Sequence, residues 1–364
     1  MKFIDLGSQY LELKHDINSA IQKVLEHGQY ILGPEVKELE DRLAAYVGVK
    51  HCIGMSSGTT ALQAALMALD IKPGDEVITS AFSFFATAEV IALIGAKAIF
   101  VDIDPKTYNL DPRLLEAKIN SKTKAIIPVS MYGQCADFDA INAIAAKYNI
   151  PVIEDGAQSF GGLYKNRKSC ALSTIGCTSF FPSKPLGCYG DAGACFTNDD
   201  ELAKKMRCIV NHGQDRRYHH TMIGINGRID TIQAAILLAK LPTFDDEIKK
   251  RQEVASWYRE AFLNKIDVPY IEKYNLSAYA QYTIQVDNRD ELQEQLQKQG
   301  IPTAVHYPIP LCEQPIFKEL DDTVYHLPVT ESVANKVMSL PFSPYISKDE
   351  VKQVAESVLR LVCE

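Results

Sequence analysis

With 364 residues, the chain is longer than one hydrophobic core usually serves, so its length predicts a large domain and a smaller one. Apolar residues form 46% of the chain and charged residues 23%, and the formal net charge of -8 argues against a broad face for nucleic acid or for an anionic membrane. No basic segment followed by an apolar run opens the sequence, and no stretch approaches about 18 uninterrupted apolar residues, so we expect a cytoplasmic protein without a membrane span.

The cysteines are scattered, odd in number and free of any CxxC pair, which indicates reduced thiols and not a disulfide framework or a zinc site. We expect most of them to be small buried hydrophobic residues. They are Cys52, Cys135, Cys170, Cys177, Cys188, Cys195, Cys208, Cys312 and Cys363.

Apolar residues at helical spacing predict a helix over residues 34–47 and another over 59–71, which begins directly after a cluster of small residues. Short apolar runs then alternate with helical patterns. This rhythm predicts an α/β fold whose mainly parallel sheet is covered on both faces. The expected strands are 75–80, 97–103, 124–130 and 150–155, and the expected helices are 84–96, 112–119 and 137–149.

Residues 177–198 are aromatic and glycine-rich between apolar pieces, which places Lys184 in a loop between two strands. From residue 240 the pattern changes, and the chain is expected to divide into a large domain, 1–240, and a small C-terminal α+β domain, 241–364. The elements expected there are helix 243–264, strand 280–286, helix 289–300, strand 301–307 and helix 349–362.

Several residues combine into a candidate site. Lys184 stands among aromatic, proline and glycine residues, although a single lysine in a loop is most often a surface residue. Asp155 ends an apolar strand, where ligands of α/β sheets bind, and could pair with the protonated nitrogen of a pyridine ring; a capping aspartate is the plainer alternative. Gln158 follows one turn later and could touch the same ring.

A phosphate site is predicted where Gly58, Thr59 and Thr60 open a helix, because backbone donors and the helix dipole favour a dianion there; the plain alternative is an N-cap. Ser179 precedes Lys184 by five residues and could point its hydroxyl into the same pocket. Phe82, Phe84 and Phe85 follow the strand 75–80, and one of them could lie against an aromatic ligand while the others pack in the core.

The segments SSGTTAL, AFSFFAT, VIEDGAQSFG, SFFPSKPLG and NGRIDTIQAA occur in the order and spacing of the DegT/DnrJ/EryC1/StrS sugar aminotransferases, which the chain resembles over nearly its whole length. This resemblance implies a fold-type-I enzyme that uses pyridoxal 5'-phosphate and forms a homodimer with shared active sites. It implies Schiff-base formation by Lys184, contact of Asp155 with the pyridine nitrogen and of Gln158 beside it, and stacking of Phe84 on the ring. It also implies phosphate contacts from Thr59 and Ser179, and from Asn226 of a neighbouring subunit.

The resemblance further implies a nucleotide-linked keto sugar as substrate and L-glutamate as amino donor. The loop around Lys184 is most similar to that of enzymes that aminate UDP-2-acetamido-2-deoxy-3-oxo-glucuronate for bacterial surface polysaccharide such as O-antigen. Other 3-keto or 4-keto deoxysugars stay open as substrates. Arg228, close to Asn226, is the first candidate to meet an anionic part of the sugar, and His306 and Tyr307 are placed near the sugar on a strand.

Three other readings are less favoured. The paired His219 and His220 invite a metal site, but no third ligand stands at suitable spacing, so we treat them as loop residues. A nicotinamide-dependent dehydrogenase would need GxGxxG after the first strand, and that motif is missing. A regulatory or DNA-binding relative that keeps only the fold conflicts with the acidic charge balance.

Overall fold

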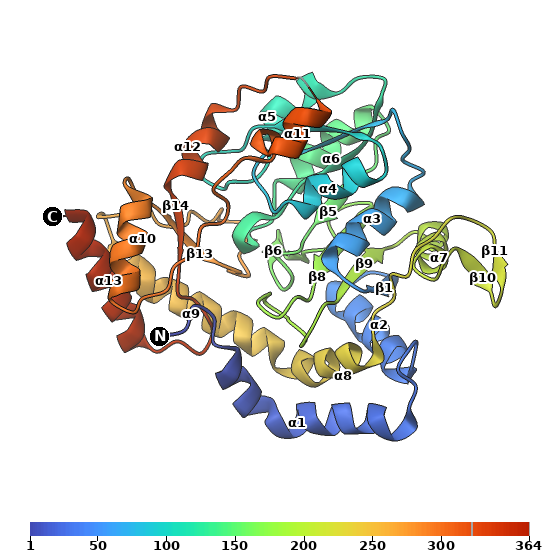
Figure 1. The fold of residues 1–364 in the computed structure, drawn as a ribbon, viewed down its shortest axis with the longest axis horizontal. Coiled ribbons are helices and arrows are strands. Elements are labelled where there is room, and N and C mark those ends of the chain that lie inside the picture. Colours follow the sequence, from blue (N-terminus) through green and yellow to red (C-terminus); the bar gives the residue numbers. More distant parts are fainter. Residues whose placement is uncertain (322, 364) are drawn as a thin grey trace.

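The computed structural model describes residues 1–321 and 323–363. Its central sheet has the strand order β1-β9-β8-β5, continued by β4-β2-β3 through bridges from Ile126 to Val152 and from Val129 to Asp155 (Figure 1). Neighbours pair in parallel, except that β9 is antiparallel to β8 and to β1. The mainly parallel sheet is therefore confirmed. Its strands are β1 (His51–Met55), β2 (Glu76–Ser80), β3 (Lys97–Val101), β4 (Thr123–Ile127), β5 (Ile153–Asp155), β8 (Ile175–Ser179) and β9 (Gly193–Thr197).

Helices cover both faces of this sheet because successive strand residues point to opposite sides. In β2, Val77 packs into a cluster with α3, α4 and α7, whereas Ile78 packs into a cluster with α6 on the other face. The helices of this part are α1 (Leu6–His27), α2 (Pro34–Val47), α3 (Gly58–Ala68), α4 (Ala86–Leu93), α5 (Pro112–Leu115), α6 (Phe138–Lys147), α7 (Asp200–Ile209) and α8 (Thr231–Lys240).

A second apolar core lies toward the C-terminus, and we call it the C-terminal core: the buried cluster that runs from Val254 to Val358. The helix α9 leads into it from α8, and the antiparallel pair β13 and β14 forms its sheet (Figure 1). Its elements are α9 (Phe244–Phe262), β13 (Tyr282–Gln285), α10 (Arg289–Lys298), β14 (Val337–Leu340) and α13 (Lys348–Cys363).

Short elements complete the fold and lie in connections between the longer ones. They are η1 (Glu116–Lys118), η2 (Met131–Gly133), β6 (Leu163–Tyr164), β7 (Arg167–Lys168), β10 (Gln214–Arg216), β11 (His219–His220), η3 (Leu241–Thr243), β12 (Asn275–Leu276), η4 (Leu311–Glu313), α11 (Pro315–Leu320) and α12 (Pro328–Lys336). Although they belong to the predicted small domain, four residues pack into the apolar cluster that covers the sheet of the large one: Leu311, Cys312, Phe317 and Leu327. The predicted division at residue 240 stays a prediction.

One predicted strand, 301–307, is wrong: the segment is irregular, and a single bridge joins Ala304 to Ser339. Prolines at 302, 308 and 310 explain the difference, because proline lacks the N–H that a β-ladder requires. His306 and Tyr307 are therefore held by an irregular segment and not by a strand.

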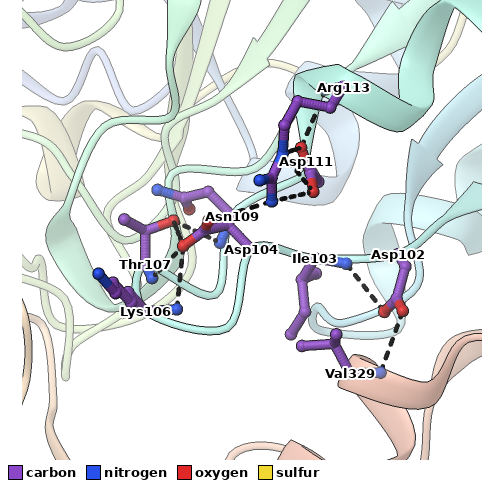
Figure 2. A network of polar contacts seen from close by, with 9 residues as sticks. All are labelled: Asp102, Ile103, Asp104, Lys106, Thr107, Asn109, Asp111, Arg113 and Val329. Carbon is purple, nitrogen blue, oxygen red and sulfur yellow. Dashed lines mark hydrogen bonds and ion pairs between the residues drawn. The ribbon is translucent and has the colours of Figure 1, made fainter.

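The carboxylate of Asp102, directly after β3, fastens α12 to the sheet. It accepts hydrogen bonds from the backbone N–H groups of Val329 and Thr330 at 3.0 and 2.8 Å, and from the Thr330 hydroxyl at 2.7 Å. Figure 2 shows Asp102 beside Val329, and it also shows Asp104, whose carboxylate accepts hydrogen bonds from Lys106 and Thr107 of its own turn and lies 3.8 Å from Nη2 of Arg113. The two carboxylates therefore have different roles: Asp102 binds α12, and Asp104 stabilises its own turn.

We expect Asp102→Ala to lower the free energy of unfolding by roughly 2–4 kcal/mol, because it leaves buried N–H groups at the start of α12 without an acceptor. Asp104→Ala is the matched control and should cost under about 1 kcal/mol, since its exposed turn can bond to water. Urea unfolding of the two variants beside the parent chain measures both. Equal losses would contradict the role given to Asp102.

Candidate functional site

Lys184 lies in the loop between β8 and β9, as predicted. The loop, residues 180–190, is closed by backbone hydrogen bonds from Lys184 N to Phe181 O and from Cys188 N to Phe180 O, both 2.8 Å. Gly187 passes so close to the backbone of Pro182 that a Cβ there would lie 2.4 Å from its carbonyl oxygen. The lysine is thus presented by a tightly folded turn, while its side chain is only partly covered.

Asp155 is the last residue of β5, at the carboxyl end of a central strand and buried, which is the predicted position. Thr87 donates its hydroxyl to one carboxylate oxygen at 2.8 Å, and the N–H of Ala157 donates to the other at 3.1 Å. Burial raises the pKa of Asp155, while these two donors and the charge of Lys184 oppose the rise. Such a carboxylate is poised to gain from a cationic partner.

Lys184 and Asp155 act on each other electrostatically. Burial lowers the pKa of Lys184, and the charge of Asp155 partly offsets this shift. His306 and Tyr307 interact electrostatically with the same two residues. Burial, and to a smaller extent the charge of Lys184, lowers the pKa of His306 to about 4. Burial, and to a smaller extent the charge of Asp155, raises the pKa of Tyr307. The irregular segment therefore brings His306 and Tyr307 to Lys184 and Asp155, while their contact with a sugar stays a prediction.

Both polar atoms of the Gln158 amide form hydrogen bonds. Its Oε1 accepts from the backbone N–H of Tyr132 at 2.8 Å, and its Nε2 donates to the hydroxyl of Tyr307 at 3.3 Å. Gln158 is buried and follows Asp155 by three residues, and its contact with the ring stays a prediction.

Of the three phenylalanines after β2, only Phe84 has its ring largely exposed, at 55%. Phe82 is buried against Tyr108 and Tyr132, and Phe85 packs against Phe317. The ring centroid of Phe84 lies 6.0 Å from that of Tyr307, which leaves an aromatic face free at the site. Packing of Phe82 and Phe85 is thus as expected, and stacking of Phe84 on a ligand ring stays a prediction.

The helix α3 begins at Gly58, as predicted, and Ser57 caps it by accepting from the N–H of Thr60 at 3.0 Å. The Thr60 hydroxyl is engaged with Ser57 and Ser56, at 3.0 and 2.9 Å. A Cβ on Gly58 would lie 2.7 Å from that of Ser179, which places the helix start beside the strand that leads to Lys184. The site can hold a phosphate by helix-terminal N–H groups and hydroxyls.

Asn226 and Arg228 lie near this helix start. Gly227, between them, has no room for a side chain, because a Cβ there would lie 2.6 Å from Cγ2 of Thr60. Asn226 is exposed, and its backbone bridges to Asn211, whose Oδ1 accepts from Nη1 of Arg228 at 2.6 Å. Nε of Arg228 is buried without a partner among the described residues. The substrate role of Arg228 and the phosphate role of Asn226 stay predictions.

These residues fit pyridoxal phosphate as a set: a buried carboxylate for the pyridine nitrogen, an amine for the aldehyde, an aromatic face for the ring, and a helix start for the phosphate. Within residues 1–321 and 323–363, no group of three or more histidine, cysteine, aspartate or glutamate residues could hold a metal ion. His219 and His220 are exposed on the hairpin of β10 and β11, where His219 contacts Asp215. No helix in the same residues is long and apolar enough to cross a membrane.

Comparison with known proteins agrees with this geometry. Residues 11–359 match the DegT/DnrJ/EryC1/StrS aminotransferase family, and the chain belongs to it. It is thus a fold-type-I aminotransferase whose cofactor is pyridoxal phosphate.

A UDP-2-acetamido-2-deoxy-3-oxo-D-glucuronate aminotransferase of Pseudomonas aeruginosa is 60% identical over 98% of this chain and 99% of its own length. Among solved structures, a DegT/DnrJ/EryC1/StrS aminotransferase from Brucella abortus superposes with a TM-score of 0.97 at 44% identity, with all of both chains covered. NtdA from Bacillus subtilis with bound cofactor PMP superposes at 0.91 and 31% identity, over 97% of this chain and 82% of its own.

Sequence reasoning missed Thr87, which donates to Asp155, and Ser83, whose hydroxyl lies 2.8 Å from that of Thr87. Both belong to the segment AFSFFAT, of which only the aromatic rings were predicted to meet a ligand. A buried threonine at the start of a helix beside a strand end was the available signal.

Proposed function

We propose that the protein transfers an amino group from L-glutamate to a keto group on a nucleotide-linked sugar. The observation that carries this proposal is the convergence of Lys184, Asp155 and residues 306–307 at the carboxyl edge of the sheet. The charges of Lys184 and Asp155 act on each other, and besides burial Lys184 lowers the pKa of His306 and Asp155 raises that of Tyr307. Membership of the aminotransferase family and the relatives above support it.

When bound, pyridoxal phosphate supplies an electron-accepting ring that stabilises negative charge at the carbon losing its proton. Asp155 holds a proton on the ring nitrogen, and its burial strengthens that ion pair. Lys184 Nζ takes the proton from the α-carbon of the donor and returns one to the sugar carbon in the second half-reaction. The lowered pKa of Lys184 suits this base role, because it increases the share of neutral amine at any given pH.

For the remaining cofactor contacts, we propose that Thr59, Ser179 and the N–H groups at Gly58 bind the phosphate, Phe84 stacks on the ring, and Gln158 touches it from the side. Asn226 would add a phosphate contact from a second subunit. Its exposed side chain supports a role at an interface. We therefore propose a homodimer with shared active sites.

We propose UDP-2-acetamido-2-deoxy-3-oxo-glucuronate as the sugar, for a bacterial surface polysaccharide such as O-antigen. The Pseudomonas aeruginosa relative, whose printed name states this substrate, supports the choice. Arg228 is the proposed partner of an anionic group of the sugar, because its Nε lacks a partner. Another 3-keto or 4-keto nucleotide deoxysugar is the second candidate. The eight described cysteines are buried and free, which supports a reducing, cytoplasmic setting.

A substrate comparison tests this proposal. The protein loaded with pyridoxal phosphate is given glutamate and either the 3-keto uronate or the matched UDP sugar that carries CH2OH in place of the carboxylate, and amino sugar is measured by mass spectrometry. We expect kcat/KM for the uronate to exceed that for the CH2OH sugar by about 100-fold or more, because the neutral sugar leaves the cationic group of the site without an anionic partner. Equal values would contradict the uronate assignment, and no product from either sugar would contradict the nucleotide-sugar proposal.

A further inference from the structure

A buried cation contacts the turn that carries Lys184. Lys240, the last residue of α8, is 2% exposed, and its ammonium donates to the carbonyl oxygen of Gly187 at 2.7 Å. It donates also to Oε1 of Gln9 at 2.8 Å and lies 4.1 Å from the ring centroid of Tyr189. The ammonium thus contacts the Lys184 loop twice, at residues 187 and 189.

The contact with Gly187 bears on the position of Lys184. Gly187 lies against the backbone of Phe181 and Pro182, and Phe181 is the residue whose carbonyl accepts from the N–H of Lys184. A shift of Gly187 would therefore move the acceptor that fixes the backbone of Lys184. The side chain of a lysine is long, so a small rotation of its backbone displaces the reacting nitrogen.

A chain of buried hydrogen bonds continues from Lys240 to a different part of the fold. The amide of Gln9, on α1, donates to both oxygens of Glu247 on α9, at 2.9 and 3.0 Å. The same carboxylate accepts from the hydroxyl of Tyr345, between β14 and α13, at 2.7 Å. Burial lowers the pKa of Lys240 to about 8, and the charge of Glu247 opposes that shift. The buried cation is tolerated because each of its neighbours is an acceptor, an aromatic face or a distant carboxylate.

We propose that Lys240 is a positioning residue for the Lys184 loop: it fixes the carbonyl of Gly187 and, through Gln9 and Glu247, couples this loop to the segment that leads into the last helix of the C-terminal core. The proposal rests on the function proposed for Lys184. It assigns Lys240 no contact with cofactor or substrate. Its effect is on where the Lys184 amine stands and on how often the loop opens.

The test compares Lys240→Met with Lys168→Met. Lys168 is the matched control, since its ammonium also lies over a tyrosine, 3.9 Å from the ring centroid of Tyr46, but it makes no hydrogen bond to residues 180–190. In the cofactor-free protein, Lys240→Met should raise the rate of amide hydrogen exchange over residues 181–188 about tenfold or more, because the loop loses its buried anchor. The control should leave that rate unchanged.

In the protein loaded with pyridoxal phosphate, rapid mixing with glutamate measures the first half-reaction. Lys240→Met should lower its limiting rate constant about tenfold or more, and the apparent dissociation constant of glutamate should change by under about threefold. A variant that melts earlier but shows the parent's exchange and the parent's limiting rate would overturn the proposal.

If Lys240→Met does not fold, Gln9→Leu decides, because it keeps the contact of Lys240 with Gly187 and cuts the connection to Glu247. A rise of about threefold or more in exchange over residues 181–188 supports the coupling, and an unchanged rate contradicts it. The exchange measurement needs no cofactor. Should the parent chain bind no pyridoxal phosphate, the proposed function fails while the role of Lys240 in the loop is still decided.

Discussion

Lys184→Ala is expected to bind pyridoxal phosphate without forming the visible absorption band of the parent protein, and to lose transamination by roughly 10³-fold or more. Two separate roles disappear in this variant. The loop no longer offers an amine to the aldehyde, and no base stands over the α-carbon of the donor. The phosphate contacts proposed for Gly58 and Thr59 and the carboxylate of Asp155 are left in place, so binding of the cofactor should weaken far less than turnover.

Absorption spectra before and after addition of glutamate measure the first effect, and amino-sugar production measures the second. Lys184→Arg is the control for charge, because it keeps a cation beside Asp155 but cannot form the imine; it should be as inactive as the alanine variant. Lys168→Met controls for the loss of any lysine and should keep the band. Turnover within tenfold of the parent in Lys184→Ala would exclude the assigned role.

The parts of this fold that rest on local pattern could be predicted from the sequence. Helix 34–47 was placed to the residue, and the end of strand β5 at Asp155 followed from its apolar run. The position of Lys184 in a loop followed from the glycines and prolines around it. These features depend on residues near one another in the chain.

Other features depend on contacts between distant segments and were missed or misplaced. The long helix α1 is missing from the predicted elements, although its buried residues Leu13, Ile17 and Val24 keep helical spacing. The segment 301–307 has strand-like residues, but its prolines and its packing decide its shape. The Thr87 contact with Asp155 spans 68 residues, and no local pattern announces it.

The nine cysteines show the same division. Composition and spacing predicted buried free thiols, and the eight described ones are buried and unpaired; the side chain of Cys363 lies outside the described residues. Strand pairing in the sheet determines which cysteines contact each other. Cys177 and Cys195 lie opposite each other on β8 and β9, with their sulfur atoms 3.8 Å apart. Strand pairing, which the sequence did not specify for β9, determines that contact.

Asp155→Asn is expected to reduce kcat by on the order of 10³-fold while the protein still folds and still forms the visible band with pyridoxal phosphate. The amide has the shape of the carboxylate. Its oxygen can keep the hydrogen bond from the N–H of Ala157, and its NH2 can donate to the Thr87 hydroxyl, but it carries no charge to hold a proton on the ring nitrogen. The ring then accepts electrons poorly, and loss of the α-proton slows.

Stability separates this effect from misfolding. Because burial raises the pKa of Asp155 in the folded state, its ionised form costs stability at neutral pH in the cofactor-free protein, and that cost grows as the pH rises above the ordinary aspartate value. The neutral amide avoids this cost. Cofactor-free Asp155→Asn should therefore melt at or above the temperature of the parent at pH 7, by differential scanning calorimetry.

Thr87→Val is the matched control, since it removes one hydrogen bond to Asp155 but leaves the charge in place. It should lower kcat by under about tenfold. The charge of Asp155 also raises the pKa of Lys184, so the asparagine variant should release a neutral Lys184 amine at lower pH than the parent does. If Asp155→Asn turns over at the rate of the parent, the ring nitrogen needs no carboxylate in this enzyme. If Asp155→Asn melts well below the parent, Asp155 stabilises the fold instead.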